Sequence, residues 1–259
     1  MNVVLLRVGI DTGCGGMAGP IFSDGSFEFI PIDSDRNLKG RTYGSLPGRH
    51  GGRKLIDYFP ERLRLKMQDC FVHDDPEFKT FTYGDPTRPK QGLRDLAPGD
   101  LLVFYAGLCG WKDCTAPAAL YIVGYFKVQC AGLYPELVRK YSKSEVHEMF
   151  AENYHVIHDD VHGKTYTRRR RDGTVKRSKS ELVLVKGYLG SSKLLNTAVR
   201  LSAPKKKLDR GGHPVFVLDP ALKQHFGSFT KLNAIQRSIP RRVAKDHTES
   251  AKRFVLGLD

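Results

Sequence analysis

Two long apolar runs near the middle of the chain constrain the fold most. The segment Leu101–Gly107 reads LLVFYAG and follows a Pro98-Gly99-Asp100 turn, while the segment Ala119–Val128 reads ALYIVGYFKV. Runs of β-branched and aromatic residues bounded by turn residues are typical of buried strands. Gly124 interrupts the second run, and a glycine inside a strand indicates a bulge or a sharp bend. We therefore expect two buried strands, one of them strongly bent.

Short strand patterns and a few helical patterns fill the remainder of the chain. Strands are predicted at residues 3–10, 27–32, 181–186, 192–201 and 214–218, and helices within 55–71, 134–153 and 222–239. These elements follow no regular βαβ order and contain no internal repeat. We predict a single α+β domain over residues 1–259, built on a strongly bent mixed sheet or a small β-barrel with flanking helices.

Composition and the N-terminal sequence limit the classes of protein to which the chain can belong. Hydrophobic residues make up 40% of the 259 residues, and no stretch approaches the roughly 20 apolar residues that cross a bilayer. The opening sequence MNVVLLRVGID has a short apolar run followed by charges, which is typical of a first strand and not of a signal peptide. We therefore expect a cytoplasmic protein with no membrane contact.

The five cysteines point to a reducing compartment, because their number is odd and no export signal precedes them. Cys109 and Cys114 have a spacing that could serve zinc, but a structural zinc site needs two further ligands. Cys130 with His155 or His158 would supply them only if the fold brought them together. We therefore predict free thiols, no assigned metal site and no identified cofactor.

Positive charge is concentrated in one stretch of the chain. Of the formal net charge of +14, about +12 falls between Lys164 and Arg210, a stretch with 15 basic and 3 acidic residues. Such a field attracts polyanions, most often nucleic acid. Within it, residues 164–180 read as an inserted basic hairpin with its tip at Asp172-Gly173. The nucleic-acid contacts predicted on this arm are Arg168, Arg169, Arg170, Arg171, Lys176 and Arg177. The alternative is a solvated loop that aids solubility.

A glycine-rich loop follows the first predicted strand, in the sequence Asp11-Thr12-Gly13-Cys14-Gly15-Gly16. Its backbone N–H groups could cradle a phosphate or a base, with Asp11 as a base, a metal ligand or a hydrogen-bond acceptor. The spacing matches neither the Walker nor the Rossmann pattern, although Gly-Ile-Asp-Thr-Gly echoes the first phosphate loop of actin-like ATPases. The alternative is a tight turn that simply needs glycine.

A second candidate site joins the segment His73-Asp74-Asp75-Pro76-Glu77 to Tyr83-Gly84-Asp85. Carboxylates and an imidazole at this spacing could bind a divalent metal or share general acid–base work. Alternatively, the aspartates only cap a turn. The predicted catalytic residues are Asp11, Asp75 and Asp85, and the predicted pocket residues are Thr12, Gly13, Gly15, Gly16, Asp24 and Tyr83.

Two resemblances extend these predictions. The segments Arg7–Gly13, Gly19–Phe22, Asp24–Ile32, Asp75–Phe78 and Thr82–Asp85 resemble the third family of nucleotide-modification-associated domains, over most of the chain. That family is implied to work beside DNA base hypermodification systems of prokaryotes and their viruses. The resemblance implies DNA and other modification-system proteins as partners, and it assigns no catalytic residues.

The second resemblance is to PUA-like barrels, the group that includes ASCH and EVE domains. It rests on Pro98–Tyr105 and Tyr121–Val128, about 30 residues in which a Pro-Gly-Asp turn leads one strand and a glycine interrupts a later one. Members of that group often bind RNA or modified bases. The resemblance implies a small β-barrel, although this chain is longer than those barrels.

The predicted function is that of a nucleic-acid-associated protein that recognises or helps to make a modified base. A base within a duplex would have to be flipped into the pocket. The alternative is a metal-dependent transferase or hydrolase of free nucleotides, in which Asp11, Asp75 and Asp85 would hold the metal. A third alternative is a structural adaptor whose basic face meets an acidic partner.

Overall fold

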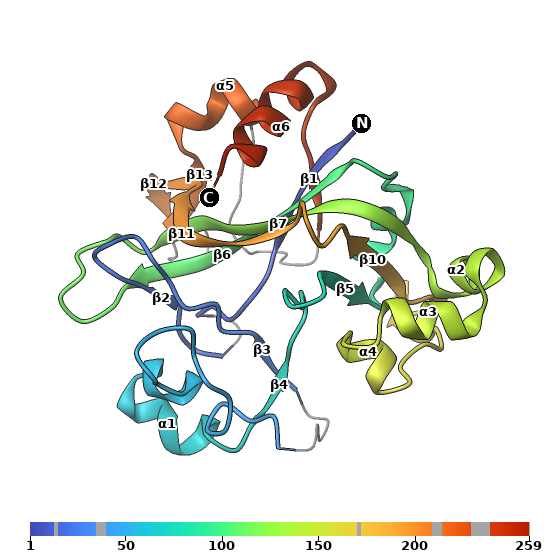
Figure 1. Ribbon diagram of the computed structural model, residues 1–259, viewed down its shortest axis with the longest axis horizontal. Coiled ribbons are helices and arrows are strands. Elements are labelled where there is room, and N and C mark those ends of the chain that lie inside the picture. The colour runs from blue at the N-terminus through green and yellow to red at the C-terminus, as the bar shows by residue number, and fades with distance from the viewer. Residues whose placement is uncertain (13–14, 35–39, 170–171, 209–213, 229–238, 259) are drawn as a thin grey trace.

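The structure is a computed structural model that describes residues 1–12, 15–34, 40–169, 172–208, 214–228 and 239–258. A mixed sheet of eight strands runs through the centre of the molecule (Figure 1). Its strands are β1 (Val3–Arg7), β2 (Gly19–Ile21), β5 (Thr82–Asp85), β6 (Leu101–Gly110), β7 (Ala119–Leu133), β10 (Val183–Gly187), β11 (Lys193–Arg200) and β14 (Arg241–Arg242). The main path runs β14–β1–β6–β7–β10–β5, with β2 beside β6 and β11 beside β7.

Strand β7 is long enough to serve two partners on one edge. Its first half pairs with β11 and its second half pairs with β10, both antiparallel. On its other edge it pairs with β6, and the register shifts where Phe104 faces Gly124. A methyl group on Gly124 would lie 2.6 Å from the Lys193 carbonyl oxygen and 2.8 Å from the Phe78 ring, so only glycine fits. The bulge predicted at Gly124 is thus confirmed.

The predicted α+β class with a large mixed sheet is confirmed, but the PUA-like barrel is not. Within the described residues the sheet begins at β14, ends at β5 and does not close on itself. A barrel needs its two end strands to pair, but among the described residues β14 pairs with β1 and β5 pairs with β10, and no pairing joins β14 to β5. Strands β10 and β11 pair with different parts of the same edge of β7.

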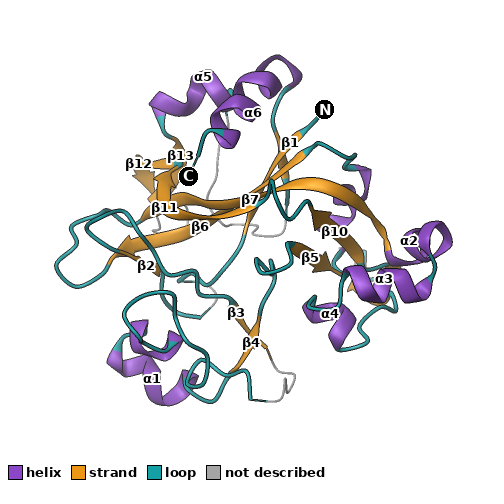
Figure 2. Cartoon of the chain, in the orientation of Figure 1, coloured by secondary structure: helices purple, strands orange, loops and turns teal. Residues whose placement is uncertain are grey.

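Among the described residues, three two-stranded ribbons lie outside this sheet. Helices lie around it (Figure 2). The ribbons are β3–β4 (Ile32–Ser34 and Phe71–His73), β8–β9 (Lys164–Arg169 and Val175–Ser180) and β12–β13 (Ser202–Leu208 and Pro214–Leu218). The helices are α1 (Glu61–Met67), α2 (Tyr134–Tyr141), α3 (Lys143–Met149), α4 (Tyr154–Ile157), α5 (Lys223–Phe226) and α6 (Thr248–Leu256), with short 3-10 turns at Leu55–Tyr58, Arg88–Asp95, Pro220–Leu222 and Lys245–His247. Among the described helices, none has the length and apolar character of a membrane span.

The buried side chains of the described residues form one large core and two satellites. The large core lies along β1, β6 and β7. One satellite gathers Tyr43, Tyr58 and Phe59 with Val72 of β4, and the other gathers buried residues of β10 with those of α2 to α4. Strands β4 and β5 and helix α4 come together between these satellites (Figure 1). The candidate site lies there.

Candidate metal centre

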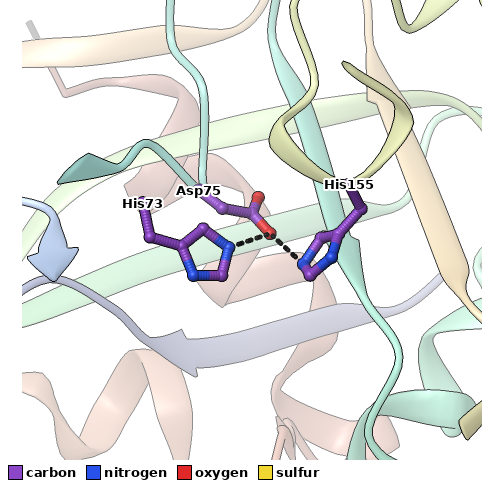
Figure 3. Close-up of side chains that lie close together, drawn as sticks. All are labelled: His73, Asp75 and His155. Carbon is purple, nitrogen blue, oxygen red and sulfur yellow. Dashed lines mark ion pairs between the residues drawn. The ribbon is translucent and has the colours of Figure 1, made fainter. Parts of the chain in front are cut away.

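Three side chains from distant parts of the chain converge on one point. His73 ends β4, Asp75 follows it by two residues, and His155 lies in α4. Their ligand atoms all lie within 4.8 Å of one another. Asp75 Oδ2 is 3.9 Å from His73 Nε2 and 3.6 Å from His155 Nε2, with the imidazoles on either side of the carboxylate (Figure 3).

Backbone groups of β5 fix the position of Asp75. The Gly84 N–H donates to both carboxylate oxygens, at 3.1 and 3.2 Å. A methyl group on Gly84 would lie 2.9 Å from Asn153 Oδ1 and 3.1 Å from the His155 ring, so glycine lets α4 pack directly on β5. Asn153 in turn caps α4 by accepting from the His155 N–H at 3.1 Å. Gly84 thereby brings Asp75 and His155 together.

The two imidazoles are also held in place. His155 Nδ1 lies 3.1 Å from a carboxylate oxygen of Asp160, which leaves Nε2 directed at Asp75. A carboxylate on the distal nitrogen is the usual way in which proteins orient a metal-binding histidine. The His73 ring stacks on Tyr154 at a centroid distance of 3.8 Å, and the Tyr154 hydroxyl hydrogen-bonds the Ser34 hydroxyl. Residues of β3 and α4 therefore hold the His73 side chain, which extends from β4, in place.

The carboxylates around the cluster have opposite pKa shifts. Burial raises the pKa of Asp75 well above its usual value of 3.8, against the Gly84 hydrogen bonds, and the nearby charge of Asp85 raises it further. Burial also acts to raise the pKa of Asp85, but the Lys90 ammonium at 3.1 Å and the Thr87 N–H outweigh it, so that pKa is lowered. An ionised Asp75 is thus costly unless a cation compensates it.

The donor set and the spacing suit a transition metal. Ligands at about 2.0–2.2 Å from an ion lie roughly 3–3.5 Å apart, slightly closer than the oxygen–nitrogen distances given above. Two imidazoles with one carboxylate favour zinc, iron(II) or manganese(II), whereas magnesium and calcium prefer oxygen ligands. Three protein ligands leave coordination positions for water or a substrate. The cluster can therefore hold a reactive metal.

The structure brings two of the three predicted catalytic carboxylates together. Asp75 belongs to the cluster, and Asp85 lies close enough to alter its pKa. The Tyr83 hydroxyl donates to Asp85 at 3.2 Å. Asp11 instead forms a buried ion pair with Arg7 at 3.0 Å, against Gly107 of β6. Across the described residues, the His73–Asp75–His155 group is the one triad with metal-ligand spacing, and it includes neither Asp11 nor Asp85.

The other predicted pocket residues lie in turns. Thr12 is exposed, while Gly15 and Gly16 have φ angles of +89° and +75° and face Ile10 and Leu63. Asp24 forms an exposed turn in which its carboxylate accepts from the Ser26 N–H and hydroxyl. Gly13 lies outside the described residues. The role of these residues in a pocket stays a prediction.

The predicted basic arm forms the β8–β9 hairpin. Gly173 at its tip has a φ of +82°, and Asp172 accepts from the Thr174 N–H and hydroxyl. In the register of the pair, Arg168 faces Lys176. Arg169, Lys176 and Arg177 are exposed, while Arg170 and Arg171 lie outside the described residues.

Sequence reasoning missed His155 and Asp160 as members of this site. It considered His155 only as a zinc partner for cysteines, and the described residues include no such cysteine cluster. The chain between Asp75 and His155 carries no motif that links them. The sequence offered one local signal, a histidine five residues before an aspartate, His155 and Asp160.

A separate buried carboxylate gives a pH prediction. Burial raises the pKa of Glu28 above its usual value of 4.5, against the Arg49 N–H that donates to it at 2.7 Å. The folded state therefore binds this proton more tightly than the unfolded chain does. As a result, the free energy of unfolding falls as the pH rises above 4.5. We expect Glu28→Gln to gain stability relative to wild type as the pH rises from below 4.5 to 7. Urea unfolding at several pH values measures this, and a pH-independent difference would contradict it.

Comparison with known proteins agrees with the resemblance seen in the sequence. The family described as nucleotide modification associated domain 3 matches residues 2–256, which is nearly the whole chain. Neither the curated proteins nor the solved structures provide a match. The chain belongs to the nucleotide modification associated domain 3 family.

Proposed function

We propose that this protein acts in DNA base modification through a divalent metal bound by His73, Asp75 and His155. The observation that carries the proposal is the convergence of these side chains, with His155 oriented by Asp160. Family membership supports the link to nucleotide modification. In this proposal the protein recognises the base or helps to modify it.

A metal with open coordination positions supplies a Lewis acid and can activate a bound water. The neighbouring Asp85–Lys90 ion pair gives the site a second, ionised carboxylate. Asp85 is accordingly the proposed proton acceptor beside the metal, and Asp11 has no role in this step.

The β8–β9 hairpin is the proposed grip on the DNA backbone. Its exposed Arg169, Lys176 and Arg177 form part of the basic stretch that carries most of the net charge. Each phosphate contact makes the logarithm of the binding constant fall more steeply as the logarithm of the salt concentration rises. A hairpin that grips phosphates acts independently of base identity, so base preference must come from the metal site.

The test is fluorescence anisotropy with short DNA, carrying plain or hypermodified bases, across a salt series. We expect Lys176→Ala with Arg177→Ala to weaken binding equally for all bases and to reduce the salt slope by about one per lost contact. Arg139→Ala with Lys143→Ala is the matched control, because it also removes one exposed arginine and one exposed lysine, from α2 and α3.

Chelation of the metal should change the preference among bases and not the contacts with phosphates. Treatment with EDTA is expected to remove the preference for modified bases while leaving the salt slope unchanged. If EDTA leaves the preference intact, the metal has no part in recognition. If the arm variant and its control behave alike, the hairpin is not the backbone contact.

A further inference from the structure

A cation–aromatic patch is formed by the loop that follows β6 and by residues 49–53, and it shares no residue with the metal centre or the basic arm. Trp111, the single tryptophan of the chain, is half-buried there. The Arg53 guanidinium lies 5.1 Å from the centre of its ring, and the Lys112 ammonium lies 4.4 Å from it. We define the cation–aromatic patch as Arg49, His50, Arg53, Trp111 and Lys112.

The Trp111 ring rests on a rigid aromatic floor. Phe22 meets it edge-on and Tyr58 lies tilted against it, each at a centroid distance of 5.5 Å. The backbone N–H of Trp111 donates to the Ile21 carbonyl at 3.0 Å, which ties the loop to β2. Lys112 has a φ of +53°, a conformation uncommon for a residue with a side chain. The ring is thus held in place before any ligand arrives.

Charge on the patch is mostly positive. Lys112 is exposed and Arg53 is half-buried, while the Arg49 side chain is exposed in part and its guanidinium donates to the Leu195 carbonyl at 3.1 Å. Arg49 lies over Phe27 at 5.4 Å, and the His50 ring meets Phe22 edge-on at 5.0 Å. Asp113 is an exposed acid in the same loop, while Glu28 is buried beneath Arg49. Basic groups interleaved with aromatic rings bind phosphates and stacked bases at once.

We propose that the cation–aromatic patch binds single-stranded DNA, with an unstacked base on Trp111 or on a guanidinium plane and the adjoining phosphates on Arg49, Arg53 and Lys112. A base inside a duplex is already stacked on its neighbours, so the patch favours a strand with exposed bases. The inference rests on the proposed function only in taking DNA as the substrate. It deepens that function by naming the exposed strand as the form that binds.

Because Trp111 is the only tryptophan, its fluorescence reports this patch alone. Titration with an oligothymidylate of about eight nucleotides is expected to quench it with saturation, whereas a duplex of equal length is expected to leave it unchanged. Arg53→Ala with Lys112→Ala is expected to weaken binding of the labelled oligonucleotide at least tenfold by anisotropy, while Arg139→Ala with Lys143→Ala keeps wild-type affinity. Circular dichroism confirms that each variant is folded.

The outcomes separate this inference from the proposed function. If anisotropy rises while Trp111 fluorescence stays constant, DNA binds elsewhere, so the patch is overturned and the proposed function stands. Equal quenching by the duplex overturns the preference for single strands. If neither signal changes at low salt, both the patch and the DNA-binding role are overturned. The metal content of the protein is measured separately and tests the metal site by itself.

Discussion

Replacing Asp75 with asparagine is expected to abolish metal binding, because the site loses its one anionic ligand and keeps two neutral imidazoles. Asparagine has nearly the same shape and can still accept from the Gly84 N–H, so the fold is retained. His155→Ala should have the same effect. Asp160→Asn is expected to weaken affinity by about 10–100-fold, because it removes only the group that orients His155.

Metal content after loading with zinc, iron(II) or manganese(II) can be measured by mass spectrometry, and affinity by calorimetry. Asp74→Asn is the matched control, because it changes the adjacent carboxylate, which pairs with Arg41 at 2.7 Å and lies outside the cluster. Wild-type affinity in Asp75→Asn, or no bound metal in the loaded wild-type protein, would overturn the proposed site.

Phe104→Ala is expected to destabilise the folded protein by about 3–5 kcal/mol, the usual cost of removing a buried aromatic ring. Phe104 is fully buried, and its ring lies 4.6 Å from Phe126 and 5.6 Å from Phe78. Phe78 follows the turn that carries Asp75, so the cavity should also loosen the metal site. Urea unfolding measures the stability, and metal affinity measured in the same samples should fall.

Val175→Ala on the β8–β9 hairpin is the control for this change. Its side chain is largely exposed, so the substitution is expected to alter stability by less than about 0.5 kcal/mol. A loss below about 1.5 kcal/mol in Phe104→Ala would mean that the core around β6 and β7 can collapse into the space.

Local features of the fold could be predicted from the sequence. Strands β6 and β7, the bulge at Gly124 and the basic hairpin at Gly173 all follow from short patterns of apolar and turn residues. The open sheet could not be distinguished from a barrel, because closure depends on which strands pair. Those pairings join segments that are far apart in the chain, as with β1, whose parallel partner β6 lies almost a hundred residues away.

The candidate site was predictable only in part, for the same reason. The segment around His73 and Asp75 showed chemistry-bearing residues close together, so a metal or acid–base role could be anticipated. His155 could not be linked to them, because its place depends on the close approach of α4 to Gly84. Asp11 had an equally suggestive local sequence, yet its carboxylate is neutralised by Arg7 in another part of the fold.

The position of the cluster between the two satellite cores has a consequence for cooperativity. His73 extends from the β4 side, next to Val72, and His155 lies beside Val156 of the other satellite. An ion shared by the two would act as a removable cross-link between two folding units. Hydrogen exchange in the two satellites would then be coupled in the loaded protein and independent in the chelated one, so metal supply would set how many parts of the chain unfold together.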